Sequence, residues 1–281
     1  MDTILVTGGN GQLGLEINDI HHEYPNYKFI FTDISELDIT NYNDVKSFVK
    51  SNSINIIINC AAYTNVDLAE SEYKAADSVN NRAVANIANL SKLYNIRLVH
   101  ISTDYVFDGN SFTPYKEQDE TNPQNIYGKT KLDGELIMKH INPPNSIIIR
   151  TSWLYSKFGK NFYQTMLNLA KTKNEIYVVN DQYGSPTNAK CFAHSIMKIL
   201  NNLTNTSVEL YHYSNKGVCS WYEFAQNIFR INKIDVNLNP IKSGDFKTIA
   251  KRPKYSALDN NLIMETFNLK ISNWVDSLKI N

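Results

Sequence analysis

Short, mostly apolar segments recur along the first half of the chain. They span residues 3–7, 28–32, 55–59, 97–102 and 146–151. A strand with one face in water alternates apolar and polar residues, whereas a strand covered on both faces is apolar almost throughout. The five segments therefore predict strands of a sheet that is buried on both faces.

Longer segments with a helical pattern separate these strands. Apolar residues recur at helical spacing within residues 12–22, 43–50, 74–94 and 126–140. Strands that alternate with helices are typical of right-handed crossovers in a parallel sheet. We therefore expect an α/β fold with a Rossmann-type, doubly wound parallel sheet in a first domain of residues 1–151.

The alternation loosens in the second half of the chain. Helical patterns remain at residues 162–172, 189–203 and 221–231. Residues 237–256 carry turn residues without a clear period, and Trp221 fits the apolar face of a helix better than a stacking platform. We expect residues 188–205 to pack back onto the first domain, and a smaller, interleaved C-terminal lobe formed by residues 152–187 and 206–281.

The composition excludes several classes of protein. Lys and Arg together number 28, as do Asp and Glu, and this balance argues against a nucleic-acid or membrane-surface binder. No stretch approaches the roughly 18 apolar residues of a membrane span, and the N-terminus lacks the basic segment of a signal peptide. The three cysteines are far apart without a C-x-x-C motif, so we expect a cytoplasmic protein rather than a disulfide or zinc scaffold.

Three glycines with the spacing G-x-x-G-x-x-G follow the first predicted strand, at Gly8, Gly11 and Gly14. Glycine permits a tight turn at Gly8, close approach of a pyrophosphate at Gly11 and close helix–strand packing at Gly14. The helix that follows offers unpaired N–H groups to phosphates. A glycine-rich turn into a structural helix is the alternative, but the position after the first strand favours a dinucleotide site.

Asp33 ends the second predicted strand, about 20 residues after Gly14, where an acid accepts hydrogen bonds from the adenosine ribose hydroxyls. A carboxylate there repels the 2′-phosphate of NADPH, and Ile34, Ser35 and Glu36 supply no cation to bind one. The sequence therefore predicts NADH or NADPH as the cofactor, with NADH favoured.

Tyrosine and lysine four residues apart on a helix share one face and can bring a phenol and an ammonium group to one site. Three such pairs occur: Tyr24/Lys28, Tyr42/Lys46 and Tyr127/Lys131. The first pair contains a proline, and the second lies on the crossover after the second strand, too early to meet the nicotinamide. The third pair begins the helix after the fourth strand, which ends near Thr103, and ligands of open α/β sheets bind beyond such strand ends.

Tyr127, Lys131 and Thr103 have the chemistry for carbonyl reduction. A free phenol has a pKa near 10, and a neighbouring ammonium and the positive nicotinamide would lower it. Tyr127 could then protonate a carbonyl oxygen as hydride reaches its carbon, while Lys131 holds the nicotinamide ribose and Thr103 donates to the same oxygen. We expect these three residues to be catalytic, and Tyr127 and Lys131 also to contact the cofactor.

These residues resemble the extended short-chain dehydrogenase/reductase family, in particular its members that reduce a keto sugar carried on dTDP. Residues 102–109, which read Ser-Thr-Asp-Tyr-Val-Phe-Asp-Gly, carry the most specific part of the resemblance. The other matching segments follow in family order over most of the chain: residues 7–14, 59–67, 127–131, 150–155, 180–187 and 251–253.

The resemblance implies NAD(P)H-dependent reduction of the C4 carbonyl of dTDP-4-dehydro-6-deoxy-L-mannose to dTDP-L-rhamnose, with the C-terminal lobe binding the substrate. It implies that Thr103, Asp104 and Trp153 touch the sugar. Arg252 is our own candidate for the diphosphate, because a guanidinium fork fits phosphate; a solvated loop cation is the alternative. The cofactor contacts that the resemblance implies come from Gly11, Gln12, Leu13, Asp33, Asp38, Ile39, Ala61, Ala62 and Tyr63.

The resemblance has one clear departure. Some members dimerise around a magnesium ion held by glutamates, and Glu16 matches one such position. Lys190 stands where those members carry another carboxylate, and a cation cannot ligate magnesium. We therefore expect no metal and a monomer or homodimer without a magnesium bridge.

Two other functions remain as alternatives. A nucleotide-sugar dehydratase or epimerase is the first, but dehydratases typically carry Thr-Asp-Glu, and Tyr105 replaces that glutamate here. A non-catalytic nucleotide-binding regulatory subunit is the second, and the intact trio of Thr103, Tyr127 and Lys131 argues against it.

Overall fold

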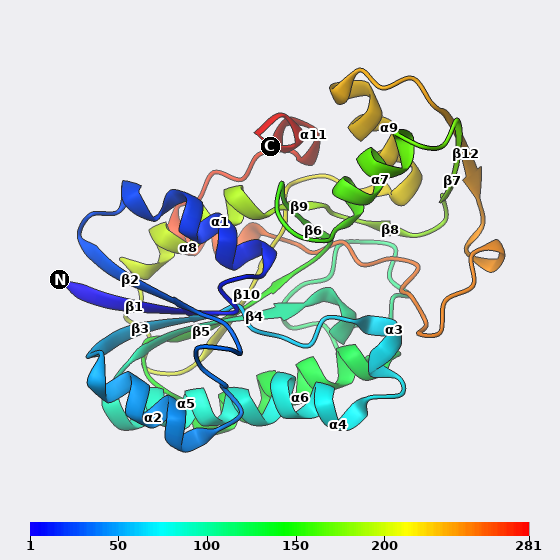
Figure 1. Ribbon diagram of the computed structural model, residues 1–281. Helices are drawn as coiled ribbons and strands as arrows, with labels where there is room; N and C mark the ends of the chain where they lie inside the picture. The colour runs from blue at the N-terminus through cyan, green and yellow to red at the C-terminus, as the bar shows by residue number, and fades with distance from the viewer. Residues whose placement is uncertain (281) are drawn as a thin grey trace.

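Six parallel strands form the central sheet of the computed structural model, which describes residues 1–280 (Figure 1). Across the sheet the order is β10-β5-β4-β3-β1-β2. The bounds are β1 Asp2–Thr7, β2 Tyr27–Thr32, β3 Ile54–Asn59, β4 Arg97–Thr103, β5 Ser146–Thr151 and β10 Glu209–Tyr213. All five pairings between neighbours are parallel, which confirms the predicted Rossmann-type sheet.

Helices cover both faces of this sheet. On one face lie α1 (Gln12–Ile20) and α8 (Ala189–Leu200), and on the other α2 (Tyr42–Ser51), α5 (Ala83–Tyr94) and α6 (Ile126–Ile141) (Figure 1). Each face has its own buried apolar cluster. The strands are therefore apolar on both sides because both sides are covered.

The predicted helix over residues 74–94 is interrupted. It consists of α4 (Tyr73–Asp77), a π-helical turn (Ser78–Arg82) and α5. The π-helical turn brings the buried side chain of Asn80 toward α6, where it donates to the hydroxyl of Thr130 at 3.1 Å. Such turns are often found at functional sites, and this one lies next to the helix that carries Tyr127.

The sixth strand differs from the sequence-based expectation, which assigned residues 206–281 to the second lobe. β10 instead pairs with β5 at the edge of the central sheet. Tyr213 stacks on Phe192 of α8, and Tyr211 makes an edge contact with Phe267 of α10 (Asn261–Phe267). These aromatic contacts bury β10 against α8 and α10.

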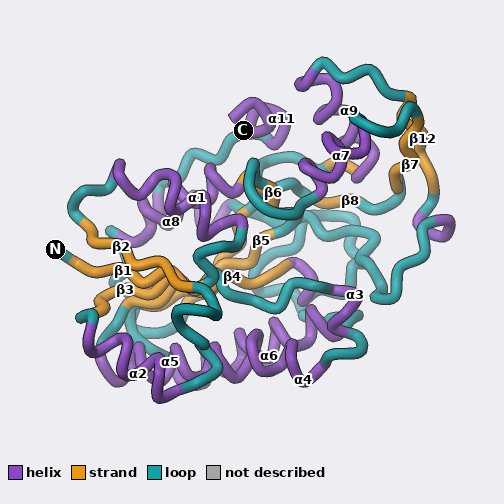
Figure 2. The backbone as a smooth tube through the Cα atoms, viewed as in Figure 1, coloured by secondary structure: helices purple, strands orange, loops and turns teal. Residues whose placement is uncertain are grey.

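The second lobe lies beside the central sheet (Figure 2) and has a smaller apolar cluster of its own. Its helices are α7 (Phe162–Ala170), α9 (Trp221–Asn232) and α11 (Trp274–Ser277). Three short strand pairs complete the lobe. Two are parallel: β7 (Glu175–Val179) with β12 (Asn237–Ile241), and β6 (Leu154–Tyr155) with β9 (Thr187–Asn188). The third, β8 (Tyr183–Gly184) with β11 (Cys219–Ser220), is antiparallel. None of the helices in residues 1–280 combines the length and the apolar character needed to cross a bilayer.

Candidate active site

The glycine turn lies at the carboxyl end of β1, and its shape requires glycine. Gly8 has a φ of +66°, and a Cβ there would lie 2.7 Å from the backbone nitrogen of Ala61. A Cβ on Gly14 would clash with the carbonyl oxygen of Gly8. Gly11 is the N-cap residue of α1, and no side chain caps that helix. The turn therefore presents main-chain N–H groups, which fits a pyrophosphate.

Asp33 follows β2 and lies beside this turn. One carboxylate oxygen accepts a hydrogen bond from the backbone N–H of Asn10 at 3.0 Å, and the other accepts from Ile34 at 2.8 Å. These bonds hold a negative charge next to the glycine turn. That arrangement suits ribose hydroxyls and opposes a phosphate in the same place.

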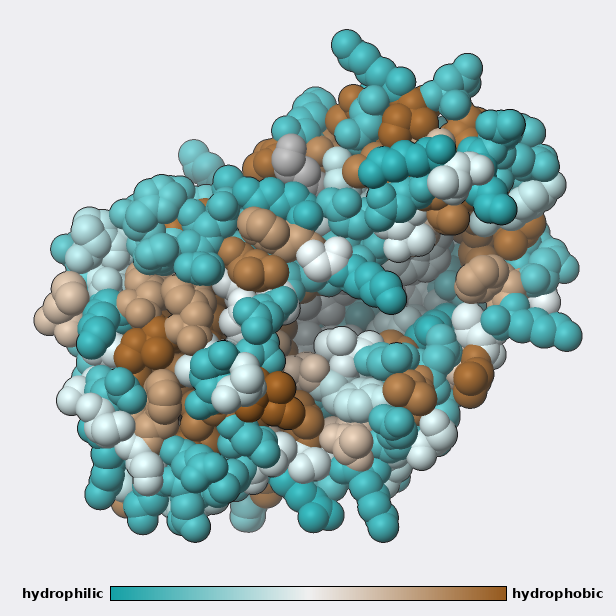
Figure 3. All heavy atoms as spheres, in the orientation of Figure 1, coloured by the Kyte–Doolittle hydropathy of each residue, from teal (hydrophilic) through white to brown (hydrophobic). Residues whose placement is uncertain are grey.

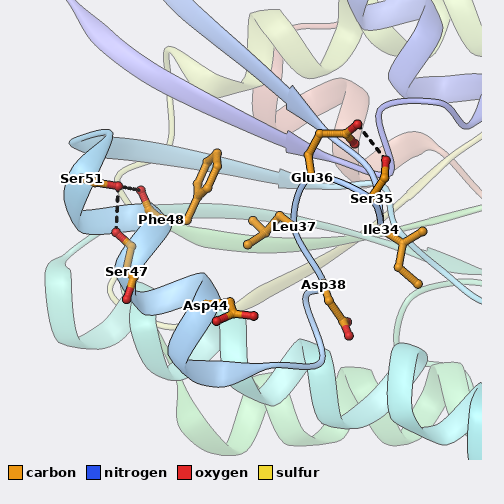
Figure 4. Close-up of a pocket in the computed structure, with 9 residues that line it drawn as sticks. All are labelled: Ile34, Ser35, Glu36, Leu37, Asp38, Asp44, Ser47, Phe48 and Ser51. Atoms are coloured by element: carbon orange, nitrogen blue, oxygen red, sulfur yellow. Dashed lines mark hydrogen bonds between the residues drawn. The ribbon is translucent and has the colours of Figure 1, made fainter.

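A hollow of about 480 Å³ opens next to Asp33, between the loop after β2 and α2 (Figure 4). Of its nine lining residues, three are acidic and none is basic. Asp38 lines this hollow, while the side chain of Ile39 packs into the core below. The lining residues are Ile34, Ser35, Glu36, Leu37, Asp38, Asp44, Ser47, Phe48 and Ser51.

The loop after β3 brings Ala61, Ala62 and Tyr63 to the same edge of the sheet. Asn80 holds this loop, since its side chain accepts from the Tyr63 N–H at 2.9 Å and donates to the Tyr63 carbonyl at 3.1 Å. On the other side of the turn, Gln12 begins α1 and Leu13 buries its side chain in the core. A cofactor contact of Leu13 or Ile39 would therefore come through the backbone.

Thr103, Tyr127 and Lys131 come together at the carboxyl end of β4. Thr103 is the last residue of β4, and its hydroxyl is a hydrogen-bond partner of the Tyr127 phenol. Tyr127 is the second residue of α6, whose N-cap Asn125 accepts from the Gly128 N–H at 2.8 Å. Lys131 lies one turn further and is 1% exposed, with its ammonium donating to the Ile101 carbonyl at 2.6 Å.

The protonation states of this trio follow from burial. Burial raises the pKa of Tyr127, and the charge of Asp104 adds to that shift, against the hydrogen bond from Thr103. Burial also lowers the pKa of Lys131 to about 8, and the carboxylate of Glu135 opposes this shift. The sequence led us to expect a lowered pKa for the Tyr127 phenol. In the protein without cofactor the pKa is raised instead, so Tyr127 holds its proton.

Asp104 is buried directly behind the trio. It is 2% exposed and accepts a hydrogen bond from the Thr103 hydroxyl at 3.0 Å. Burial raises the pKa of its carboxyl group to about 7, although hydrogen bonds from Ser256 and Thr103 act in the opposite direction. A carboxyl group in this state can donate or accept near neutral pH.

Trp153 forms an aromatic wall with Trp221, a residue expected from the sequence on the apolar face of a helix rather than in a stacking platform. Its ring stacks on that of Trp221, with centroids 3.4 Å apart and planes within 6°. A Cβ on Gly184 would lie 2.5 Å from the Trp153 ring. The backbone of Trp153 has a φ of +47°, a conformation that residues other than glycine rarely adopt. Trp221 thus lies on the apolar face of α9 and is also a stacking partner.

Arg252 is not a free loop cation. It donates to a carboxylate oxygen of Asp67, on α3 (Val66–Ala69), at 2.6 Å, and Asp67 also accepts from the Ala250 N–H at 2.9 Å. The guanidinium lies 6.0 Å from the ring of Tyr105, whose ring contacts that of Tyr127 edge-on. Sequence reasoning could not find this pair, because no local pattern links residues so far apart in the chain.

Glu16 and Lys190, at the positions where the resemblance implied magnesium ligands, bind other side chains. Glu16 is 1% exposed and accepts from the Ser156 hydroxyl at 2.5 Å. The ammonium of Lys190 lies 3.5 Å from a carboxylate oxygen of Asp19, which also pairs with Lys157 at 2.9 Å. Within residues 1–280, no three His, Cys, Asp or Glu side chains are grouped so that they could hold a metal ion.

Comparison with known proteins gives a consistent result over the full chain. Residues 1–280 match the family described as RmlD substrate binding domain. A dTDP-4-dehydrorhamnose reductase from Aggregatibacter actinomycetemcomitans is 40% identical, covering 99% of this chain and 98% of that protein. The spore coat polysaccharide biosynthesis protein SpsK from Bacillus subtilis is 37% identical, covering 99% and 96%.

Solved structures agree with these sequence matches. A dTDP-4-dehydrorhamnose reductase from Bacillus anthracis, in complex with NADP, has a TM-score of 0.94 at 40% identity and covers 99% of this chain and 98% of its own. A Clostridium acetobutylicum dTDP-4-dehydrorhamnose reductase has a TM-score of 0.93 at 43% identity, covering 99% and 97%. A dTDP-glucose 4,6-dehydratase from Bacillus anthracis shares only the fold, at 18% identity and a TM-score of 0.83 over 100% and 95%.

Proposed function

This chain belongs to the RmlD substrate binding domain family, and on that premise we propose that it reduces dTDP-4-dehydro-6-deoxy-L-mannose (dTDP-4-dehydrorhamnose) to dTDP-L-rhamnose. It is an NAD(P)H-dependent oxidoreductase acting on the C4 carbonyl. The observation that carries the proposal is the convergence of Thr103, Tyr127 and Lys131 beside a glycine turn, in a chain whose full-length relatives include reductases of this name.

Tyr127 is the proton donor in this proposal. When bound, the reduced nicotinamide supplies a hydride to C4, and the carbonyl oxygen takes the phenol proton to become a hydroxyl group. The raised pKa of Tyr127 supports the role, because a donor must hold its proton until the oxygen becomes basic. Thr103 donates to the same oxygen, and Lys131 holds the nicotinamide ribose and stabilises the phenolate that forms.

The cofactor is a nicotinamide dinucleotide, and we infer a preference for NADH. The main-chain cradle of the glycine turn fits the pyrophosphate. Asp33 and the acidic hollow beside it support NADH, because neither offers a cation to a 2′-phosphate. The Bacillus anthracis relative, by contrast, was solved with NADP.

Three further residues are proposed to bind the substrate. The wall of Trp153, backed by Trp221, offers an apolar surface to a sugar ring, and the buried carboxyl group of Asp104 offers a polar contact near C4. Arg252 has five N–H donors, and only some of them face Asp67, so the guanidinium can also serve the diphosphate.

The remaining inferences concern the whole chain. We propose that residues 1–151, residues 188–205 and β10 bind the dinucleotide, and that the rest binds the nucleotide sugar. Figure 3 shows the surface hollowed between these two parts, which supports a site there. We propose a cytoplasmic protein that is a monomer or a homodimer without a magnesium bridge, because Lys190 pairs with Asp19.

One assay tests the function. The purified protein is given NADH or NADPH with dTDP-4-dehydro-6-deoxy-L-mannose, and the loss of reduced-dinucleotide absorbance is followed together with formation of dTDP-L-rhamnose. A dehydratase would instead convert dTDP-glucose with NAD⁺, and a regulatory subunit would bind both ligands without turnover. Either of these outcomes would reject the proposed reaction.

A further inference from the structure

The proposed catalytic lysine is one of three ionisable side chains that are buried near the end of β4. Lys131, Glu135 and Arg150 are 1%, 0% and 2% exposed. Glu135 accepts two hydrogen bonds from the Arg150 guanidinium, at 2.9 and 2.7 Å, one on each carboxylate oxygen. The guanidinium also lies 4.9 Å from the ring of Phe107. Burial of charged groups costs free energy of desolvation, a cost that apolar side chains of similar size would not have.

Glu135 also binds the strand that ends at Thr103. Its carboxylate accepts from the Ser102 hydroxyl at 2.5 Å, while Lys131, one helical turn earlier on α6, donates to the carbonyl of Ile101. Two successive residues of β4 are therefore held by two successive turns of one helix face. Thr103 is the next residue of the strand.

The groups that face Lys131 show which charge acts on it. Cys60 directly follows β3, and burial raises its pKa to about 12. His100 lies on β4, and burial lowers its pKa well below the usual value. Both are neutral near pH 7. Glu135, on α6 itself, is the principal group that opposes the effect of burial on Lys131. No direct ion pair joins Lys131 and Glu135 among the described residues, so the carboxylate acts through its field.

We propose that Glu135 is a positioning residue for the reduction: held by Arg150 and Ser102, its carboxylate keeps Lys131 charged and fixes the end of β4 that carries Thr103. The inference rests on the proposed function, which gives Lys131 and Thr103 their roles. A purely structural ion pair would stabilise the fold but would leave the titration of Lys131 and the placement of Thr103 unaffected.

The first test replaces the pair by apolar residues, as Glu135→Leu/Arg150→Met. Removing Glu135 alone would leave a buried unpaired guanidinium, whereas exchange of a whole buried ion pair for apolar residues of similar size is often tolerated. The matched control is Asp276→Leu/Lys279→Met, which removes an exposed pair at 3.0 Å far from Lys131 in the sequence.

The readout is the dissociation constant for NADH, measured by fluorescence from about pH 6 to about pH 10 without any sugar. In the wild type, affinity should fall as pH rises past about 8, when Lys131 loses its proton. In the Glu135/Arg150 double variant the fall should begin at least about one pH unit lower, whereas the control should follow the wild type. A folded double variant with the wild-type pH dependence would overturn the proposed effect on Lys131.

The second test, Ser102→Ala, removes only the hydroxyl group that bonds Glu135 and leaves both charges in place. We expect kcat to fall about tenfold while the NADH affinity at neutral pH stays unchanged, because Thr103 would be held less firmly. An unchanged kcat would overturn the proposed positioning of β4. If the double variant does not fold, the kcat of Ser102→Ala by itself decides whether the proposal stands. A wild type that binds NADH but does not reduce the keto sugar would instead reject the proposed function, and the NADH titrations would still test Glu135.

Discussion

At the residue scale, burial sets the protonation states of Tyr127 and its neighbour Asp104. The phenol is a hydrogen-bond partner of Thr103, its ring contacts that of Tyr105 edge-on, and the charge of Asp104 acts on it. Burial raises the pKa of the Tyr127 phenol and of the Asp104 carboxyl group, so both hold protons more tightly than they would in water. A reduction needs such a protonated donor at the carbonyl oxygen.

Replacing Tyr127 with phenylalanine tests this residue directly. Tyr127→Phe keeps the ring but removes the proton donor, so kcat should fall at least about a hundredfold while NADH binding and the melting temperature change little. Steady-state kinetics and NADH titration measure both. Tyr42→Phe is the matched control, since Tyr42 also precedes a lysine by four residues but lies on α2. Normal turnover by Tyr127→Phe would refute the assignment.

Asp104 makes a prediction about stability and pH. Its pKa is about 7 in the folded protein against 3.8 for the ordinary carboxyl group, so between these values the folded state binds more protons than the unfolded state. The contribution of Asp104 to the free energy of unfolding is therefore highest below about pH 4. This contribution falls by on the order of 2–4 kcal/mol as pH rises to about 7.

Asp104→Asn removes this titration. In urea unfolding, the stability of the wild type relative to Asp104→Asn should be greater at pH 4 than at pH 7. Asp276→Asn, at an exposed position, serves as the control for general charge effects. An equal difference between wild type and Asp104→Asn at the two pH values would contradict the raised pKa.

The proposed preference for NADH gives a prediction for Asp33. In Asp33→Ala the carboxylate next to the glycine turn is lost, so repulsion of a 2′-phosphate disappears together with the bond to the ribose hydroxyls. The ratio of kcat/KM for NADPH to that for NADH should rise at least about tenfold. A wild type that already prefers NADPH by more than about tenfold would contradict the charge argument.

At the scale of elements, the sequence pattern predicted what depends on local periodicity. The five apolar runs appear as β1 to β5 because both faces of those strands are covered. β10 was assigned to the other lobe because its place depends on aromatic contacts with α8 and α10, far away in the chain. β12 was missed because Asn237–Ile241 contains a proline and pairs only with β7.

The location of the candidate site was predictable to a similar degree. The glycine turn, Asp33 and the choice of Tyr127/Lys131 follow from where strands end, which the sequence pattern indicates. The Arg252–Asp67 pair, the stack of Trp221 on Trp153 and the Glu135–Arg150 pair depend on tertiary packing. No spacing rule connects those partners, so only the folded structure reveals them.

Contact between α6 and the π-helical turn gives a prediction at this scale. A Cβ on Gly134 would clash with the carbonyl oxygen of Asn80, which is backbone and cannot move aside cheaply. Gly134→Ala should lower the free energy of unfolding by about 1–3 kcal/mol despite the better helix propensity of alanine. It should also weaken NADH binding, because Asn80 holds Tyr63.

Gly244→Ala is the matched control, since nothing lies within 4 Å of the added Cβ. Urea unfolding and NADH titration of the two variants provide the comparison. A Gly134→Ala variant as stable as Gly244→Ala would show that α6 can move away from the π-helical turn, and that this contact does not fix the helix carrying Tyr127.

At the scale of the whole molecule, the two lobes meet around the site, and the segment that carries Arg252 ties them together. The Asp67 carboxylate binds both Ala250 and Arg252, and the Asn125 side chain donates to the Lys251 carbonyl at 3.0 Å. Asn125 is also the N-cap of α6. The segment from Ala250 to Arg252 is therefore bonded to the helix that begins just before Tyr127. Arg252, proposed to bind the substrate, and Tyr127, proposed to donate the proton, thus belong to one connected unit.

The last prediction concerns metal and assembly: exhaustive treatment with EDTA should change neither kcat nor the sedimentation coefficient. In the proposed mechanism Tyr127 and Thr103 donate to the carbonyl oxygen, so no Lewis acid is needed to polarise it. At the two positions where the sequence resemblance implied magnesium ligands, Lys190 pairs with Asp19, and Glu16 is buried and accepts from Ser156. Analytical ultracentrifugation and the reduction assay, before and after chelation, measure both quantities. If EDTA abolished turnover, or dissociated a dimer that magnesium restored, other carboxylates of this chain would have to supply the ligand that Lys190 lacks.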